Sequence, residues 1–307
     1  MADTILVAVD GRPEHRAALD WAAARAARTG AALELIHVVE RSLADSGEQS
    51  ARMLTLAGRS LVAEEERYAL RRARAARHPE HASAALEQPE PPVRGRVVVG
   101  HAGRDVATAA AGATLLVVGT PAAVRTQRSV AGSIAARVAA AASCTVVAVP
   151  HGWRGHGHGV VVGVDGEPHA EPALDFAADE AAWLGEPLAV VYVGYAVGAV
   201  RDGRRVGGPT AEEGDLRERI LAAAARRALG RHPGLAISTR VVEAVPSTGL
   251  VSEAHGARAL VLGTHDRRGV KRLVLGSVGH EVLLRARLPV AIVREGAVSP
   301  SSGPAPA

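Results

Sequence analysis

The sequence predicts two tandem α/β domains, each a doubly wound, five-stranded parallel sheet flanked by helices. Three observations predict this fold class. The chain of 307 residues is long enough for two hydrophobic cores. An internal repeat covers nearly all of it, and apolar strand segments alternate with helical segments in each copy. Strands that are apolar without alternation are typical of parallel sheets covered on both faces.

The internal repeat keeps its parts in the same order at nearly constant spacing. The segment ILVAVDG, which contains Asp10, returns as VVVGVDG, which contains Asp165, 155 positions later. The segment that ends in Gly119 and a threonine returns with Gly263, 144 positions later. Copy one therefore holds 11 extra residues between its first and last thirds. We expect them in loops and in the second helix, where insertions are tolerated.

Each copy is expected to contribute five strands in the same order. The strands of copy one are expected near Ile5, Leu33, Val97, Leu115 and Val146. Those of copy two are expected at 159–164, 188–193, 236–242, 259–262 and 289–293, with helices over 170–184 and 277–285 and a short one after Pro246. The segment from Thr210 to Glu213 is a capping box that opens a helix to about His232. The Gly-rich residues 195–209 are expected to form a flexible loop.

These patterns predict a first domain over residues 1–150, a Gly/His linker over 151–159, a second domain over 160–295 and a disordered tail over 296–307. The linker carries three histidines separated by glycines. Such a segment lacks the fixed geometry and supporting hydrogen bonds of a metal site, so none is predicted.

Composition and charge favour a cytoplasmic protein without nucleic acid or membrane as a partner. No apolar run approaches the roughly 18 residues that span a bilayer, and the N-terminus does not resemble a signal peptide. The single cysteine, Cys144, fits a reducing compartment and is expected to be a buried apolar residue. The net charge of +4 leaves nucleic acid as an alternative. However, the basic residues alternate with acids along helices, and aromatic residues make up only 2% of the chain.

Candidate binding residues gather where the strands of copy two end. Ligands of open parallel sheets bind beyond the carboxyl ends of the strands. Asp165 ends strand one, Gly263 ends strand four, and Gly276 and Ser277 open the last helix, whose unpaired amides attract anions. The arrangement predicts a phosphate cradle, although an aspartate or a Gly-Ser pair at such positions often only caps a turn or helix. The equivalent residues of copy one are Asp10, Gly119, Gly132 and Ser133.

At these residues the chain resembles the universal stress protein A family, in its tandem-domain, actinobacterial type. ATP-binding members of that family carry the motif Gly-x2-Gly-x9-Gly-(Ser/Thr). Both copies keep its spacing, but Asp266 replaces the second glycine in copy two and Ala122 replaces it in copy one. A carboxylate beside phosphate is repelled, and Pro121 stiffens the turn of copy one. These departures put nucleotide binding in doubt in both copies.

The resemblance implies a Rossmann-like, adenine-nucleotide alpha-hydrolase-like fold and the binding of ATP, with or without a Mg²⁺ or Mn²⁺ ion. It implies that the strand-one aspartates meet adenine and that a strand-two valine reads the adenine edge through its backbone. It also implies that a residue of the motif loop lies near ribose and phosphates. The residues at these and the adjoining positions are Asp10, Asp165, Val164, Val38, Val193, His265 and Val278.

We expect a binding protein rather than an enzyme. The sequence has no Gly-x4-Gly-Lys-(Ser/Thr) loop and no Gly-x-Ser-x-Gly elbow. We also expect no pair of histidine and carboxylate to recur at the strand ends of both copies beyond the Asp10 and Asp165 positions. The related ATP-pyrophosphatase family needs a Ser-Gly-Gly signature after strand one, and this chain lacks it.

The expected function is ATP-linked regulation of the stress response, with an adenine nucleotide and an unidentified protein as partners. We expect tighter ATP binding by copy two and a homodimer of tandem chains. The alternative is a stress protein that has lost nucleotide binding and acts as a protein-interaction scaffold. The substituted second glycine favours that alternative.

Overall fold

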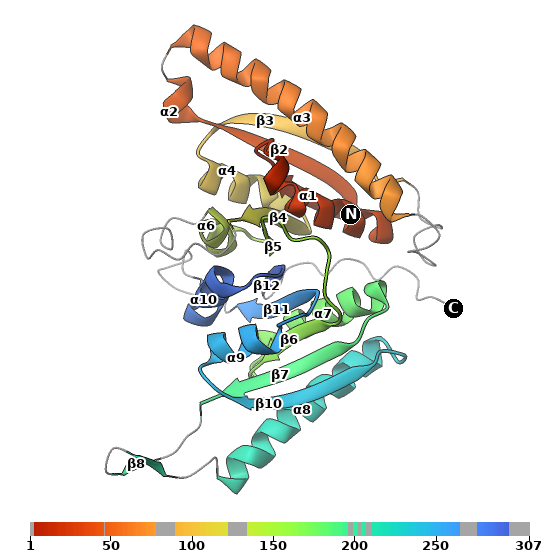
Figure 1. Cartoon of the computed structure of the whole chain (residues 1–307), viewed down its shortest axis with the longest axis vertical. Helices are drawn as coiled ribbons and strands as arrows, with labels where there is room; N and C mark the ends of the chain where they lie inside the picture. The colour runs from red at the N-terminus through yellow and green to blue at the C-terminus, as the bar shows by residue number, and fades with distance from the viewer. Residues whose placement is uncertain are drawn as a thin grey trace.

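The computed structural model describes residues 3–45, 47–77, 90–121, 134–195, 199–201, 204–206, 210–264 and 275–294 (Figure 1). The strands of this part of the chain are β1 (Thr4–Ala8), β2 (Ala32–Glu40), β3 (Val93–Gly100), β4 (Leu115–Thr120), β5 (Thr145–Pro150), β6 (Val160–Val164), β7 (Leu188–Gly194), β8 (Ala199–Arg201), β9 (Arg204–Val206), β10 (Ile237–Glu243), β11 (Ala259–Thr264) and β12 (Val290–Arg294). Its α-helices are α1 (Ala17–Thr29), α2 (Arg41–Ala44), α3 (Glu48–Ala76), α4 (Ala102–Ala109), α6 (Ile134–Ala141), α7 (Ala170–Leu184), α8 (Ala211–Arg231), α9 (Pro246–Glu253) and α10 (Ser277–Arg285).

The two copies form a single sheet, in the order β10-β7-β6-β11-β12-β5-β4-β1-β2-β3. Within each copy the five strands are parallel neighbours in the same internal order, which confirms the predicted fold class. The copies meet where β5 and β12 pair antiparallel, with Val146 opposite Ile292 and Ala148 opposite Val290. Antiparallel pairing of the two equivalent last strands relates the copies by a local twofold axis. We call this junction the seam.

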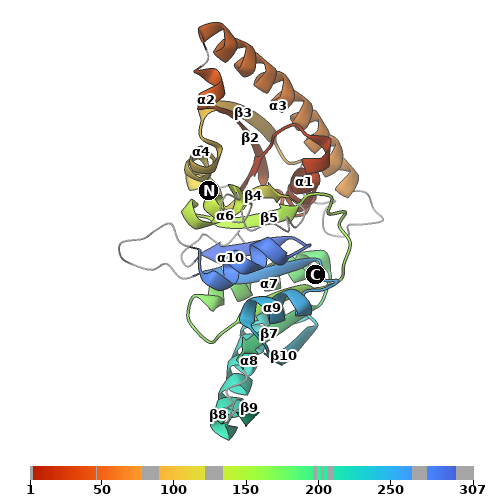
Figure 2. The same ribbon diagram turned by 60° about the vertical axis from the view of Figure 1, so that its left-hand side comes forward.

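Helices cover both faces of the sheet (Figures 1 and 2). Buried residues of α1, α3, α7 and α8 pack on one face, and those of α4, α6, α9 and α10 pack on the other. Each of these two apolar clusters contains residues of both copies, so the hydrophobic core continues across the seam. No helix of the described residues is long and apolar enough to cross a membrane.

Local sequence signals account for several element ends. The predicted capping box is present: the Thr210 hydroxyl accepts a hydrogen bond from the Glu213 amide, and the Glu213 carboxylate accepts one from the Thr210 amide. Helices α1 and α7 end at Gly30 and Gly185, both in the left-handed conformation that glycine adopts without strain. Helix α3 has 29 residues and its equivalent α8 has 21, which places most of the extra residues of copy one in the second helix, as expected.

One local prediction was wrong. Within the expected loop 195–209, strands β8 and β9 pair antiparallel as a small separate hairpin. The sequence between them is Asp202-Gly203, a dipeptide that is typical of tight hairpin turns. The two short strands flank that dipeptide, so the signal was present in the sequence.

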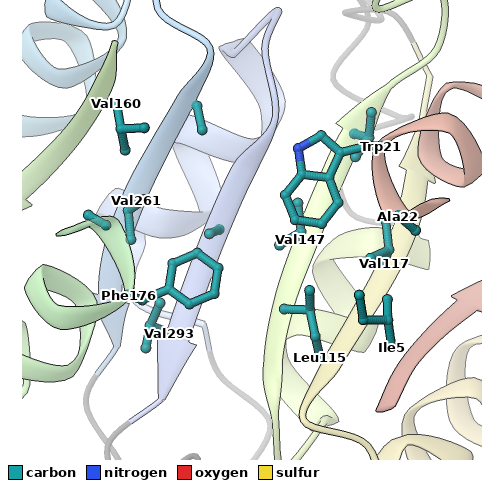
Figure 3. Packing of buried hydrophobic residues seen from close by; sticks show 14 of the residues in the cluster. Ile5, Trp21, Ala22, Leu115, Val117, Val147, Val160, Phe176, Val261 and Val293 are labelled. Atoms are coloured by element: carbon teal, nitrogen blue, oxygen red, sulfur yellow. The ribbon is translucent and has the colours of Figure 1, made fainter. Parts of the chain in front are cut away.

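Aromatic side chains lie at equivalent positions on both sides of the seam. Trp21 of α1 and Phe176 of α7 lie beside the joined strands β5 and β12, near Val147 and Val293 (Figure 3). Both rings are buried. Arg294 of β12 also donates hydrogen bonds to the carbonyls of Ala139 and Ala140 at the end of α6, a favourable place for a cation. The two copies therefore share side-chain contacts as well as a sheet.

Candidate functional site

A cavity of about 560 Å³ lies at the carboxyl ends of β1, β2 and β4, in copy one. We call it the copy-one cavity. Three predicted site residues line it: Asp10, Val38 and Gly119. Leu283 and Leu284 of α10 line it too, so copy two contributes to a cavity of copy one. Its position is the one expected for a ligand of an open parallel sheet, and its volume suits a small organic molecule.

Asp10 follows β1 and is held by its neighbours. One carboxylate oxygen accepts a hydrogen bond from the Arg12 amide at 3.2 Å, and the other lies 2.5 Å from Nδ1 of His15. The His15 ring stacks on the ring of His151, with centroids 3.6 Å apart and planes 18° apart. This cluster joins the turn after β1 to the residue that follows β5.

Arg16 lines the same cavity but is already bound to carboxylates. Its guanidinium donates to Glu65 at 2.7 Å and to Glu64 at 2.8 Å, and it lies over the ring of Tyr68. The hydrogen bond to Glu65 is the largest cause that raises the pKa of Arg16. Arg12 is more exposed, and within the described part of the chain its one ion pair is a 4.0 Å contact with Asp10. Of these two cations, Arg12 is the one available to an anion.

Gly119 lies in β4, where its missing side chain leaves room for His151. A Cβ at this position would lie 3.0 Å from Nε2 of His151. The imidazole therefore occupies the space beside the glycine that the sequence analysis assigns to a ligand. Pro121, which follows β4, also lines the cavity. The predicted residues Gly132 and Ser133, and Ala122, lie outside the described residues.

Copy two repeats the arrangement around its strand-one aspartate. Asp165 accepts a hydrogen bond from the Glu167 amide at 3.0 Å, and its second oxygen lies 3.1 Å from Nε2 of His169. A Cβ on Gly263 would lie 2.5 Å from the backbone oxygen of His169. The structure thus brings Asp165 and Gly263 together around His169. Val164 is the last residue of β6 and is buried.

The remaining predicted residues of copy two lie on β7 and at the start of α10. Val193 and Val278 are half-buried and pack against the cluster that α9 and α10 share. Gly276 is the N-cap of α10, and no side chain caps that end, while Ser277 is exposed. The predicted site residue His265 and the substituted position Asp266 lie outside the described residues.

A histidine pairs with the strand-one aspartate in both copies, at the Asp10 and Asp165 positions that the expectation set apart. His15 follows Asp10 by five residues and His169 follows Asp165 by four, and each lies just before the first helix. The turn after the strand brings the start of that helix back to the carboxylate. These short spacings were readable in the sequence. The stack of His151 on His15 was not, because it depends on the path of β5.

The described residues offer neither a metal site nor a reactive thiol. No group of three or more His, Cys, Asp or Glu residues in the described part of the chain is placed to hold a metal ion. Cys144 is buried, as predicted, and its burial raises the pKa of the thiol to about 11. A thiol with such a pKa is almost wholly protonated at neutral pH and is a poor nucleophile.

Comparisons with known proteins agree on one family. The model of the universal stress protein family matches residues 1–150 and 158–294. A universal stress protein of Mycolicibacterium smegmatis is 31% identical over 299 residues, which cover 94% of this chain and 96% of that protein. One from Mycobacterium tuberculosis is 28% identical over 303 residues, with 95% and 96% covered.

The comparison with solved structures supports the fold. A universal stress protein from Archaeoglobus fulgidus has a TM-score of 0.69 at 15% identity, with 97% of this chain and 98% of that chain covered. At this identity the likeness shows a shared fold. The family match to both copies, together with the M. smegmatis relative along nearly its full length, shows that this chain belongs to the universal stress protein family and carries its domain twice.

Proposed function

We propose that this chain binds an adenine nucleotide, ATP in the first place, at the carboxyl edge of its sheet and regulates a stress response through the bound state. The observation that carries the proposal is the copy-one cavity, because Asp10, Val38 and Gly119 line it together. These residues are distant in the sequence and stand at the family's nucleotide-contact positions.

The cavity offers different chemistry to the two ends of a nucleotide. Its inner wall is apolar and includes Ile36, Val106 and Val118, which suits a flat base. The Asp10 carboxylate can accept a hydrogen bond from the exocyclic amine of adenine. Arg12 is the exposed cation of the cavity, and it would leave its 4.0 Å contact with Asp10 to meet phosphate. A Mg²⁺ or Mn²⁺ ion, where present, would bind chiefly to phosphate oxygens and water.

We propose a second, tighter site in copy two. In copy one, Pro121 removes a backbone donor just after β4, so a phosphate finds fewer amides there. The equivalent segment of copy two has no proline and carries three arginines and the lysine of the chain between residues 267 and 272. Positive charge favours a polyphosphate, although Asp266 opposes it.

Regulation would act through the seam. Leu283 and Leu284 of copy two line the copy-one cavity, so a nucleotide there would contact both copies at once. A ligand shifts a conformational equilibrium only by binding one state more tightly, and contact with two domains provides such a difference. The nucleotide-bound arrangement would then be the form that a protein partner, or a second tandem chain, recognises. We propose binding without turnover.

The direct test is the nucleotide content of the purified full-length protein. Protein is denatured by heat, and the supernatant is examined by absorbance near 260 nm and by chromatography against adenine nucleotide standards. We expect a released adenine nucleotide, and less of it from the double variant Asp10→Ala/Asp165→Ala. Protein that releases none and does not take up added ATP would support the scaffold alternative.

A further inference from the structure

A second cavity, of about 290 Å³, lies at the seam, between the linker and the helices α1, α3 and α7. We call it the seam cavity. Both copies and the linker contribute to it, and it shares no lining residue with the copy-one cavity. The polar and aromatic residues that line it are Asp20, Trp21, Arg28, Tyr68, Arg72, Trp153, Arg154, Glu180 and Arg258.

The two acids of this cavity already have partners. Asp20 accepts hydrogen bonds from the Tyr68 hydroxyl at 2.7 Å and from Nε of Arg72 at 2.8 Å. Glu180 is ion-paired with Arg25, which is not among the residues that line the cavity. The carboxylates lining the seam cavity are therefore neutralised by other groups.

Not every arginine that lines the seam cavity has a carboxylate partner. Arg72 is paired with Asp20, and Arg258 lies 2.7 Å from Glu186. Arg28 and Arg154 have no hydrogen bond or ion pair to any residue that the structure describes. The seam cavity therefore carries two guanidinium groups whose charge has no direct partner there.

Arg28 is the stronger indication of the two, because it is half-buried whereas Arg154 is exposed. Its Nε atom is buried without a hydrogen-bond partner. Burial, and next the nearby charge of Arg258, lowers the pKa of Arg28 to about 10, with partial relief from Glu186. An arginine remains charged at neutral pH, so the protein holds a poorly solvated cation beside an open volume.

We propose that the seam cavity binds a compact oxyanion of the phosphate class, with Arg28 and Arg154 as its two donors. A guanidinium presents parallel N–H groups that match two oxygens of a phosphate, and two such groups can grip one anion from different sides. Trp21 and Trp153 provide apolar walls, which suit a small phosphorylated molecule as well as the free ion.

The site would join the linker to both copies. Arg28 belongs to α1 of copy one, Arg154 to the linker, and Leu184 on the same cavity to α7 of copy two. An anion held there stabilises the folded, joined arrangement in proportion to its occupancy. This effect does not depend on nucleotide binding at the copy-one cavity.

The test uses the full chain and inorganic phosphate as the probe. Thermal unfolding is compared in phosphate and in chloride at equal pH and ionic strength. With about 20 mM phosphate we expect the unfolding midpoint of the wild type to rise by about 2 °C or more. Arg28→Gln and Arg154→Gln should lose this rise. In chloride, Arg28→Gln should unfold at the same or a higher temperature than wild type, because it removes a half-buried guanidinium whose Nε has no hydrogen-bond partner.

Arg59→Gln is the matched control, since it removes an exposed arginine of α3 that lines neither cavity and should keep the full rise. Arg154 is exposed, so its variant tests the proposal even if Arg28→Gln folds poorly. Three results would overturn the proposal. They are a wild type that phosphate does not stabilise, a rise that survives in Arg154→Gln, and a rise that Arg59→Gln abolishes.

Discussion

Arg25 and Glu180 form a buried ion pair across the seam, and they occupy equivalent positions of the two copies. The rings of Trp21, Phe176 and Trp183 surround the guanidinium, with centroids 5.7, 5.0 and 4.8 Å from its central carbon. Equivalent positions of two domains related by a twofold axis meet at that axis. Two identical copies would bring two arginines or two glutamates together here. Opposite charges therefore favour the pairing of copy one with copy two over the pairing of two identical copies.

The Arg25–Glu180 pair can be tested by exchanging its two charges. Arg25→Glu or Glu180→Arg alone places two like charges in a dry environment, and each should lower the free energy of unfolding by about 3–5 kcal/mol. The double variant restores opposite charges and should recover much of that loss. Urea unfolding of the full chain measures both. If the double variant were no more stable than the two single ones, the pair would not be what couples the copies.

The two strand-four glycines predict a matched pair of variants with unequal effects. In Gly263→Ala the new methyl group meets the backbone of His169 at 2.5 Å, so the backbone must move. In Gly119→Ala it meets the imidazole of His151 at 3.0 Å, and a side chain can turn aside. We expect Gly263→Ala to cost about 1–3 kcal/mol more stability than Gly119→Ala. Chemical denaturation compares them, and equal stabilities would contradict the close approach of β11 to α7.

The Cys144 thiol should react slowly with alkylating reagents in the native protein. Its thiol is buried and has a pKa of about 11, above its ordinary value of 9.0, because burial penalises the thiolate. The native thiol keeps its proton to a higher pH than the unfolded one. The free energy of unfolding is therefore unaffected by this group below pH 9 and falls as the pH rises from 9 through about 11. At pH 8, iodoacetamide should label the unfolded chain quickly and the native chain only as fast as it opens. Mass spectrometry follows the labelling of both forms. Equal labelling rates would show that the native thiol is accessible.

Asp266 predicts a gain of affinity. Asp266→Gly removes a carboxylate that the family motif places beside the phosphates, and it should strengthen ATP binding by about 1 kcal/mol, which is several-fold. Calorimetric titration of wild type and variant with ATP at fixed salt tests it. Equal or weaker affinity in the variant would mean that the carboxylate holds the loop open rather than repelling the ligand.

Much of the fold could be predicted from local patterns. The expected helices 170–184 and 277–285 have the bounds of α7 and α10. Apolar periodicity and caps are properties of neighbouring residues, and they recur in both copies of the repeat. The hairpin β8–β9 was missed because three-residue strands lack a periodic pattern, although the sequence between the strands is Asp-Gly, a dipeptide typical of hairpins.

The candidate site could be predicted only in part. Position along the strands was enough to place Asp10, Val38 and Gly119 at one edge, since parallel strands end together. It was not enough to find His151, or to bring Leu283 of the other copy into the cavity. Those contacts depend on how the two copies join, as does the pairing of Arg25 with Glu180. A repeat shows that two domains exist, but not which of their side chains meet.

ATP titration of nucleotide-free, full-length protein tests the central claim most directly. Calorimetry should show saturable binding in the wild type. Asp10→Ala should weaken binding at the copy-one site by about tenfold or more, because a charged hydrogen-bond acceptor for adenine is lost. Asp45→Ala, which removes an exposed carboxylate at the end of α2, should bind as wild type does. No saturable binding in the wild type, or identical titrations for wild type and Asp10→Ala, would contradict a nucleotide site in this cavity.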